Sequence, residues 1–246
     1  MSRHRFYAPP SSIEGDQITL GPEESHHLWR VLRMRPGAVV YVFDGTGCEY
    51  VCQLQGGDHQ RARLNIVEKR HPPVESPLAI TLAQGLAKGE KFELIVQKAT
   101  ELGVHRIIPL ITAHTLSTGI REVGHHRLHR WRRIALEAAK QCGRTRIPEI
   151  LTPRRWEIFL RAFPRPALLF AERAGRSLAD VARAWSDGID TLCLLIGPEG
   201  GWQESEVAAA QTAGAIVVTL GRRILRTETA ALAAVSVVQH LWGDLR

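Results

Sequence analysis

Hydrophobic and polar residues follow two different patterns along the chain, with a change near residue 72. Before that point, short apolar runs are separated by turn residues, and two of the runs flank Asp44-Gly-Thr-Gly47, a sequence typical of a hairpin. The pattern predicts strands at 38–43, 48–54 and 61–67 and a short helix within 21–33. Short strands at this close spacing predict a small β-barrel.

Three prolines within residues 71–77 predict an extended linker and a domain boundary. Beyond them, apolar runs alternate with helical patterns, which predicts a mainly parallel sheet covered by helices on both faces. The apolar runs are 78–83, 106–111, 167–171, 191–196 and 215–220, and the helical patterns lie near 90–102, 123–142, 154–162, 177–185, 204–213 and 226–242. The last helix is apolar on most sides, which predicts burial all round, within the domain or also against a partner subunit.

The overall composition, 44% hydrophobic and 23% charged, is typical of a globular protein. No run approaches the roughly 18 apolar residues of a membrane span, and no apolar segment follows the N-terminal Met-Ser-Arg-His-Arg-Phe-Tyr. We therefore expect a cytoplasmic protein with no membrane partner.

The cysteine and histidine pattern does not favour a metal site. Cys48 and Cys52 share one strand face, but no second Cys or His pair completes a zinc site. The groups His26-His27 and His125-His126-x-x-His129 also lack clustered partners, and we expect structural or RNA-facing roles for them. The four cysteines are too few and scattered for a disulfide scaffold. We expect buried apolar thiols and no metal.

The positive charge is concentrated in one part of the chain. Residues 1–77 contain nine Lys/Arg and nine Asp/Glu, whereas residues 121–155 contain ten basic and three acidic residues, equal to the whole net charge of +7. Clustered cations favour a polyanionic partner because they release counterions from phosphates. A solvated basic helix face is the alternative.

Two segments near the C-terminus are the most informative about chemistry. Residues 194–202 and 220–230 each follow an apolar run, pass through a glycine-containing turn and open into a helical pattern. Ligands bind at the carboxyl ends of strands in open α/β sheets, so these segments predict a small-molecule pocket. Neither segment fits the common dinucleotide or phosphate-binding loops.

Several motifs in order make the chain similar to a known family. They are His26-His-Leu-x-x-Val-Leu-Arg33, Lys88-Gly-Glu-Lys-Phe-Glu93, Gln97-Lys-Ala-Thr-Glu-Leu-Gly103, Gln141-Cys-Gly-Arg144, Gly197-Pro-Glu-Gly-Gly201 and Ile224-Leu-Arg-Thr-Glu-Thr-Ala230. With these motifs the chain resembles the bacterial 16S rRNA uridine-N3 methyltransferases of the SPOUT superfamily, nearly from end to end. One departure is Trp202-Gln203, where a smaller N-capping Ser or Thr is common.

The resemblance implies a fold, a cofactor and a substrate. The fold is an α/β class with a PUA-like β-barrel at 1–72 for RNA binding and a parallel-sheet methyltransferase domain at 73–246, which contains a trefoil knot. It also implies a homodimer that binds S-adenosylmethionine (SAM) and makes 3-methyluridine near the 3′ end of 16S rRNA, on the assembled small ribosomal subunit. A related enzyme acting on a ribose 2′-OH or another base, and a non-catalytic RNA-binding assembly factor, remain alternatives.

Glycines of the two C-terminal segments allow close backbone approach to a cofactor, although they could also be plain turns. Ile224 and Leu225 offer apolar contact to the purine, and Glu199 is expected to organise the loop rather than react. With the resemblance, the expected cofactor contacts are Ala171, Glu172, Ile196, Gly197, Pro198, Glu199, Gly200, Leu220, Gly221, Ile224, Leu225, Arg226 and Thr229.

Methylation at uridine N3 requires the weakly acidic imide proton to leave, so a base or a stabiliser of the uridine anion is needed. Arg226 could hold a phosphate, a uracil carbonyl or the anion, and Glu228 could accept the proton. An internal ion pair at the start of the last helix is the alternative. The expected RNA contacts are Arg5, Arg30, Arg33, Arg35, Lys88, Lys91, Arg144 and Arg146. Such contacts position the substrate, whereas specificity requires rRNA shape and a displaced base.

Overall fold

The computed structural model describes residues 4–117, 124–172, 175–185 and 188–245. Residues 121–123, which belong to the basic stretch and contain the expected start of one helix, lie outside the described residues. The chain forms two compact units, each with its own contacts. Met1–Glu75 and Ala139–Ile147 make up the first unit, and Ser76–Ala138 and Pro148–Arg246 make up the second. The first unit thus contains residues 139–147, which are distant in the sequence from the rest of that unit.

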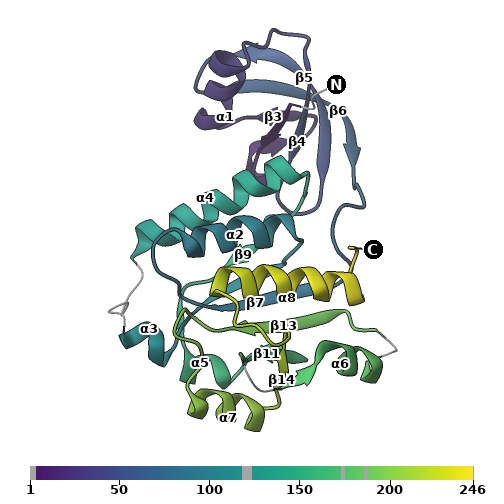
Figure 1. Ribbon diagram of the computed structural model, residues 1–246. Coiled ribbons are helices and arrows are strands. Elements are labelled where there is room, and N and C mark those ends of the chain that lie inside the picture. Colours follow the sequence, from purple (N-terminus) through teal and green to yellow (C-terminus); the bar gives the residue numbers. More distant parts are fainter. Residues whose placement is uncertain (1–3, 118–123, 173–174, 186–187, 246) are drawn as a thin grey trace. The chain divides into compact units, whose positions relative to one another are not determined.

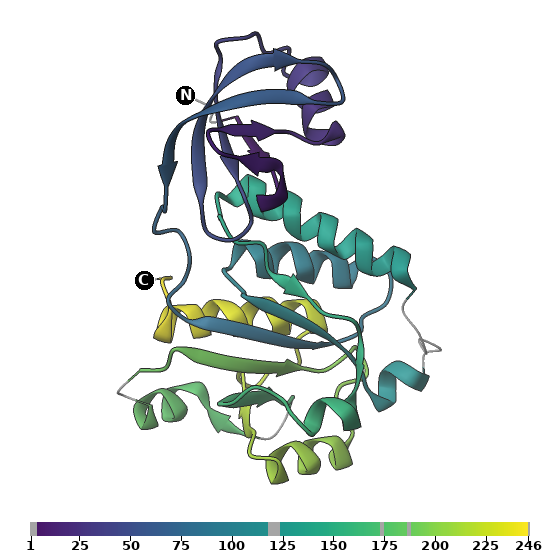
Figure 2. The same cartoon turned by 180° about the vertical axis from the view of Figure 1, so that it is seen from behind.

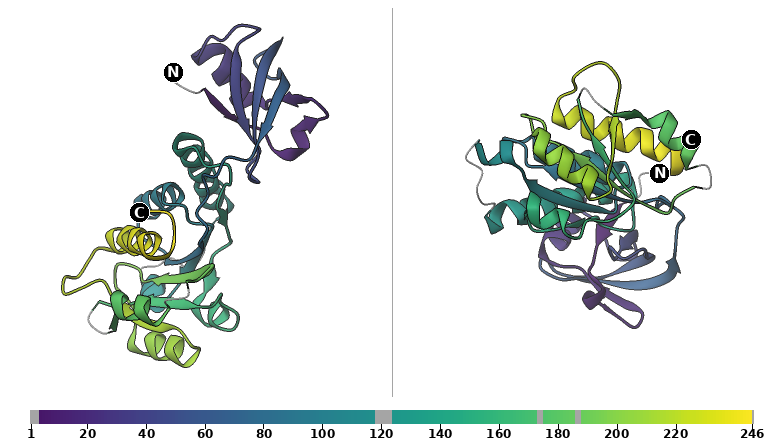
Figure 3. Two further views of the ribbon diagram at one scale, coloured as in Figure 1. Left: turned by 90° about the vertical axis from the view of Figure 1, so that its right-hand side faces the viewer. Right: turned by 90° about the horizontal axis from the view of Figure 1, so that it is seen from below.

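The first unit is built on a curled six-stranded sheet with the order β1-β4-β5-β6-β3-β2 (Figure 3). Its strands are β1 (Arg5–Tyr7), β2 (Ile13–Glu14), β3 (Gln17–Thr19), β4 (Val39–Phe43), β5 (Glu49–Gly57) and β6 (Ala62–Arg70). Neighbouring strands are antiparallel except β1 and β4, which are parallel. In the turn between β4 and β5, Asp44 Oδ1 accepts hydrogen bonds from the backbone N–H and the hydroxyl of Thr46, both at 2.8 Å. The predicted hairpin is confirmed.

A helical segment follows β3 and covers the core of this sheet. It consists of α1 (Pro22–His26), continued by the π-helical turn His27–Val31. The apolar strand residues point alternately inward, which buries a core that includes Phe6, Leu54 and Leu64. A short 3-10 turn, Pro10–Ser12, links β1 to β2.

The second unit contains an all-parallel sheet with the order β10-β8-β7-β13-β11-β14-β12, and β9 pairs with β8 beyond this path. The strands are β7 (Ala79–Gly85), β8 (Arg106–Ile111), β9 (Glu149–Ile150), β10 (Arg154–Arg155), β11 (Ala167–Phe170), β12 (Arg176–Ser177), β13 (Thr191–Ile196) and β14 (Ile216–Thr219). The central strands are almost continuous apolar runs because both faces of the sheet are covered. The predicted parallel sheet is confirmed.

Helices cover both faces of this sheet, as predicted (Figures 1 and 2). On one face, α2 (Lys91–Glu101) packs against α8 (Thr227–Trp242), and the ring centroids of Phe92 in α2 and Trp131 in α4 (His125–Cys142) lie 4.3 Å apart. On the other face, α5 (Trp156–Leu160) packs against β8 and α7 (Glu204–Thr212), and α7 packs against β14. The helices are α2 (Lys91–Glu101), α3 (Ala113–Ser117), α4 (His125–Cys142), α5 (Trp156–Leu160), α6 (Leu178–Ala184), α7 (Glu204–Thr212) and α8 (Thr227–Trp242).

Helix α8 is only partly buried within its own domain. Ala231, Ala234, Val235 and Val238 are buried, but Val237 on another side is 37% exposed. The domain by itself therefore buries only part of the apolar surface of this helix, and burial of the rest against a partner subunit stays a prediction.

Candidate functional site

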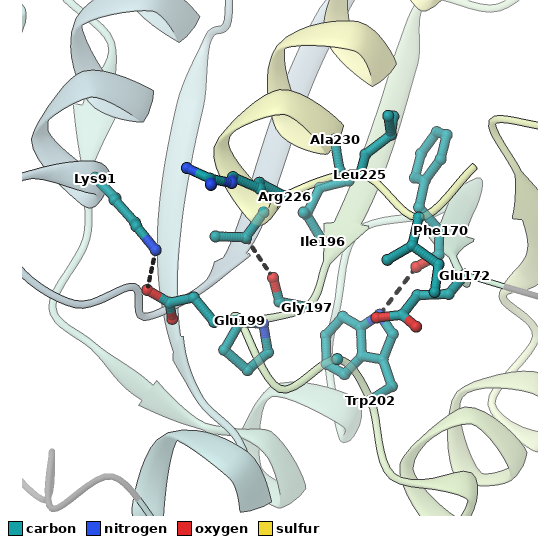
Figure 4. A pocket seen from close by; sticks show the side chains of 14 residues that line it. Lys91, Phe170, Glu172, Ile196, Gly197, Glu199, Trp202, Leu225, Arg226 and Ala230 are labelled. Carbon is teal, nitrogen blue, oxygen red and sulfur yellow. Dashed lines mark hydrogen bonds and ion pairs between the residues drawn. The ribbon is translucent and has the colours of Figure 1, made fainter.

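A pocket of about 510 Å³ opens at the carboxyl ends of the central strands of the second unit (Figure 4). Its walls come mainly from the loop that follows β13 and the loop that precedes α8, which are the two segments predicted to form a ligand site. The lining residues are Lys91, Phe170, Glu172, Ile196, Gly197, Pro198, Glu199, Gly201, Trp202, Ile224, Leu225, Arg226, Thr227 and Ala230. The sheet thus brings together two loops that are separated in the sequence by α7 and β14.

The loop after β13 is held by hydrogen bonds at its far end. Gln203 is the N-cap of α7 and forms a capping box with Glu206, so the helix has a side-chain cap although Ser or Thr is absent. The second carboxylate oxygen of Glu206 accepts a 2.9 Å hydrogen bond from the backbone N–H of Ala113. The Trp202 indole N–H donates to the carbonyl of Phe170 at 3.1 Å, which fixes the indole as a wall of the pocket (Figure 4). The unusual Trp-Gln pair therefore stabilises the loop.

Tight packing limits which residues this loop can contain. A Cβ added at Gly197 would lie 3.2 Å from the carbonyl carbon of Gly201 and 3.3 Å from the Trp202 indole nitrogen. Gly201 itself has a φ of +70°, a conformation that favours glycine. These two glycines let the loop fold back on itself beside the pocket.

The carbonyl oxygen of Gly197 links the loop to the start of α8. It accepts hydrogen bonds from the Thr227 hydroxyl at 2.6 Å and from the Gln84 amide at 3.3 Å. The same amide also donates to the Thr227 hydroxyl oxygen at 3.0 Å, and both side chains are buried. Sequence reasoning missed both residues. The available signal was the position of two polar residues: Gln84 directly follows the apolar run 78–83 and is the penultimate residue of β7, and Thr227 is the first residue of α8.

We expect Thr227→Val to weaken this link, because valine keeps the shape of threonine but cannot donate to the Gly197 carbonyl. Loss of one buried hydrogen bond costs about 1 kcal/mol, so the affinity for SAM, the cofactor implied by the resemblance, should fall about fivefold and the urea midpoint should decrease. Calorimetric titration with SAM measures the affinity, and Thr227→Ser, which retains the hydroxyl, is the control. Equal affinity of the valine and serine variants would contradict the role assigned to this hydroxyl.

Glu199 anchors the other side of the loop to the segment that follows β7. Its Oε1 accepts from the backbone N–H of Lys88 at 2.9 Å and pairs with Lys91 Nζ at 3.2 Å (Figure 4). Partial burial acts to raise the pKa of Glu199, but the hydrogen bonds from backbone N–H groups and from Lys91 outweigh it and lower the pKa. The stabilisation is therefore present above the unfolded-state pKa and is lost as pH falls through the lowered value. Glu199 has the organising contacts expected for it.

The two residues predicted to be catalytic occupy different environments. Arg226 is the N-cap residue of α8, is exposed and lines the pocket on the same side as Lys91 (Figure 4). Glu228 lies in the first turn of α8 and is half-buried, and its Oε2 is buried with no hydrogen-bond partner. The structure describes both side chains and contains no ion pair between them. The alternative of an internal Arg–Glu pair is thus not observed.

Other predicted cofactor residues lie around the main pocket rather than in its lining. Ala171 and Leu220, with Glu172 and Leu225, line an adjoining cavity of about 50 Å³. Gly200 lines a separate hollow of about 390 Å³ against α7. Gly221 has a φ of +113°, and Thr229 is exposed on α8; neither lines any of these three cavities.

The residues predicted to contact RNA divide into exposed and buried groups. Arg30, Arg33, Arg35, Lys88 and Arg146 are exposed, whereas Lys91 is half-buried and paired with Glu199 as described above.

Arg5 and Arg144 are engaged inside the first unit. The Arg5 side chain pairs with Glu49 at 2.9 Å and donates to the Arg144 carbonyl at 2.8 Å, and Arg144 pairs with Glu75 at 2.9 Å. Glu75 also accepts from the backbone N–H groups of Thr145 and Arg146. These contacts explain why 139–147 belongs to the first unit. Both side chains are nearly inaccessible to solvent, which corrects the expectation that they contact RNA phosphates.

The described residues contain no group of three or more His, Cys, Asp or Glu side chains placed to hold a metal ion. Cys52 and Cys193 are buried, which raises the pKa of each thiol to about 12, whereas Cys48 is half-buried and Cys142 is exposed. The expectation of buried thiols is therefore confirmed for two cysteines only. Of the helices in the described part of the chain, none is apolar enough over a sufficient length to span a membrane.

Comparison with known proteins places the whole chain in one family. Residues 74–239 match the family model described as an RNA methyltransferase domain, and residues 20–67 match an RNA methyltransferase PUA domain. Ribosomal RNA small subunit methyltransferase E of Synechocystis is 34% identical over 241 residues, covering 97% of this chain and 78% of the relative. The enzyme of the same name from Bacillus subtilis is 31% identical, covering 97% and 93%.

Solved structures agree with these matches. The ribosomal RNA small subunit methyltransferase E of Neisseria gonorrhoeae, bound to S-adenosyl methionine, is 35% identical, with a TM-score of 0.88 and full coverage of both chains. A protein from Legionella pneumophila, also solved with bound SAM, is 33% identical, with a TM-score of 0.87 and full coverage of both chains. These matches confirm the resemblance, and the chain belongs to the family of ribosomal RNA small subunit methyltransferases E.

Proposed function

We propose that this protein uses SAM to methylate N3 of one uridine in 16S rRNA, on the assembled small ribosomal subunit. The observation that carries the proposal is the pocket between the loops after β13 and before α8, in a chain of this family. Two glycine-containing loops that meet at the carboxyl ends of parallel strands are well suited to a small, partly apolar and partly charged ligand. The substrate would place the protein in the cytoplasm.

The residues of the pocket fit SAM by shape and by chemistry. Gly197 and Gly201 leave room for close backbone approach, and Ile224 and Leu225 offer apolar surface to a purine. Glu172, an exposed carboxylate in the same wall, can face the positive charges of the ligand. The bound cofactor supplies a methyl group already activated by its sulfonium, so positioning by the protein provides much of the rate.

The uridine imide requires loss of a proton and stabilisation of the anion that forms. Arg226 reaches the pocket and carries a permanent positive charge, which suits a uracil carbonyl or the developing anion. Glu228 has a buried carboxylate oxygen without a hydrogen-bond partner, which suits acceptance of the proton, directly or through water. In this proposal the β14–α8 connection brings both groups to the same end of α8.

Homodimer formation is also part of the proposal. α2 and α8 pack together on one face of the sheet, and Leu94 and Val237 on these helices are 41% and 37% exposed. A second copy of the chain would cover this apolar surface. The trefoil knot and the closed PUA-like barrel are further proposals; membership of this family supports the knot, and the curled sheet supports the barrel.

RNA contacts are proposed for the exposed cations Arg30, Arg33, Arg35, Lys88 and Arg146, with Lys91 at the pocket rim. Positive side chains on both units would bind phosphates without reading sequence, because the phosphate backbone is the same at every nucleotide. The choice of one uridine then depends on rRNA shape and on displacement of the base from its stack.

The test is methylation of small ribosomal subunits isolated from a strain that lacks the gene. With the purified protein and isotope-labelled SAM, we expect one methyl group per subunit, recovered as 3-methyluridine by nucleoside mass spectrometry. Recovery as a 2′-O-methylated nucleoside or another base would favour a different reaction of the same fold. SAM binding without methyl transfer to any rRNA would favour an assembly factor.

A further inference from the structure

Two exposed arginines lie on an edge strand of the parallel sheet in the second unit, and a third follows a few residues later in the chain. Arg154 and Arg155 form the edge strand β10, and Arg161 follows α5. We propose that these side chains bind phosphates of the rRNA substrate and form a second RNA-contact surface beside the methyl-transfer pocket. This inference rests on the proposed function; Arg154 and Arg155 end the basic stretch 121–155, but none of the three arginines was among the named RNA contacts.

The register of β10 places this surface at the pocket end of the sheet. Arg154 lies beside Leu110, and Arg155 lies beside Ile111, the last residue of β8. All the paired strands of this sheet run parallel, so their carboxyl ends lie at the same end of the sheet. The Gly197 loop, which follows β13, lies at this end too.

Side-chain packing connects the arginines to the pocket wall. Trp156, the residue after Arg155, packs on Trp202 with a ring-centroid separation of 4.8 Å. His114, in the helix that follows β8, has its Nδ1 3.1 Å from the Gly201 carbonyl oxygen. Trp202 and Gly201 both line the pocket. A strand bound along β10 would therefore pass close to the reacting uridine.

The arginines at the two ends of the β8 and β10 strands differ in whether they form ion pairs. At the amino end of β8, Arg106 pairs with Glu149 at 2.7 Å. The side chains of Arg154 and Arg155 at the carboxyl end, and that of Arg161 after α5, make no ion pair or side-chain hydrogen bond among the described residues. The segment 154–161 contains three arginines and one acidic residue, Glu157, and is therefore positive. Guanidinium groups without internal partners are available to phosphate oxygens.

Charged side chains on an edge strand have another known use, which is to prevent pairing with the edge of a second sheet. That role requires only exposure and charge. Phosphate binding requires in addition that the charges lie along the path of the substrate, and the position of β10 at the pocket end meets this requirement. The two roles predict different responses of RNA binding to salt.

The test measures binding of unmodified small ribosomal subunits over a range of salt concentrations. For Arg154→Ala/Arg155→Ala, the slope of log affinity against log salt should fall by about 1.4 to 1.8, because each lost phosphate contact contributes about 0.7 to 0.9. SAM affinity and the melting midpoint should remain those of the wild-type protein. The Arg154→Lys/Arg155→Lys variant keeps the charges and should restore most of the slope.

The control removes the same charge at the opposite edge of the same sheet. Arg176 lies in β12 and Arg183 in the following helix, and both are exposed. Arg176→Ala/Arg183→Ala should change the slope much less. A wild-type slope in the Arg154/Arg155 alanine variant, or an equal decrease in both double variants, would overturn the proposed surface. If the wild-type protein itself fails to methylate rRNA, the proposed function fails instead, so the two failures are distinct.

Discussion

Replacing Arg226 by alanine is expected to lower kcat by about 100-fold to 1000-fold, the usual effect of removing one group that stabilises charge in a transition state. The guanidinium lies at the pocket rim as the N-cap of α8, and no carboxylate in the described residues pairs with it. A cation free to face the substrate acts on the developing uridine anion more than on the bound cofactor. SAM affinity should therefore change by less than about threefold, by the same reasoning.

Single-turnover methylation and calorimetry with SAM separate these two effects. Arg222→Ala is the matched control, because Arg222 lies in the same connection and is exposed but does not line the pocket. Arg226→Lys should recover part of the rate, since a positive charge remains but the planar fork of donors is lost. Turnover at the wild-type rate in Arg226→Ala would remove this residue from the proposed chemistry.

Gly197→Val is expected to reduce SAM affinity by about 100-fold, because side-chain atoms added here meet atoms on both sides. The first of them would already lie 3.2 Å from the Gly201 carbonyl carbon and 3.3 Å from the Trp202 indole nitrogen. Overpacking of this kind costs about 1–3 kcal/mol, and the loop can avoid it only by moving into the pocket or away from Thr227. RNA affinity should change little, since the proposed phosphate contacts lie elsewhere.

The matched control is Gly124→Val in the same unit, where nothing lies within 4 Å of an added Cβ. The two variants carry the same substitution, so their difference reports the crowding at the cofactor loop. Calorimetric titration with SAM measures the affinity, and thermal unfolding without SAM shows whether each variant is folded. Tight SAM binding by a folded Gly197→Val protein would place the cofactor outside this pocket.

These two substitutions affect neighbouring parts of one hydrogen-bonded arrangement. The Gly197 carbonyl accepts from Thr227, which is the residue between Arg226 and Glu228. The cofactor loop and the proposed catalytic groups are therefore held to each other by a contact that neither segment could make alone. Gln84 strengthens this contact from the end of β7.

The second unit could be predicted in detail from its sequence because its elements have strong periodic patterns. The apolar runs 106–111 and 191–196 coincide with β8 and β13, and the expected helix at 204–213 closely matches α7. The strands that were missed in this unit, β9, β10 and β12, contain two residues each. Two residues cannot establish a period, so only pairing with a neighbouring strand defines them.

The locations of buried charges were not available from the sequence. Arg144 follows a basic helix and looks like a phosphate ligand, yet it is buried against Glu75, which is 69 residues away along the chain. The same set of contacts assigns 139–147 to the first unit. Net charge over a window does not reveal such pairs, because an ion pair depends on distance in space.

The sequence by itself determined the class of fold, the two segments that form the pocket and the family, since periodicity and motif order are local properties of the chain. The tertiary structure decided which polar groups join those segments, which arginines remain exposed and which face of α8 is left uncovered. Each of these depends on contacts between residues that are distant in the sequence. Gln84, Thr227 and Glu75 acquire their roles only when the sheet and the neighbouring segments bring their partners within hydrogen-bonding distance.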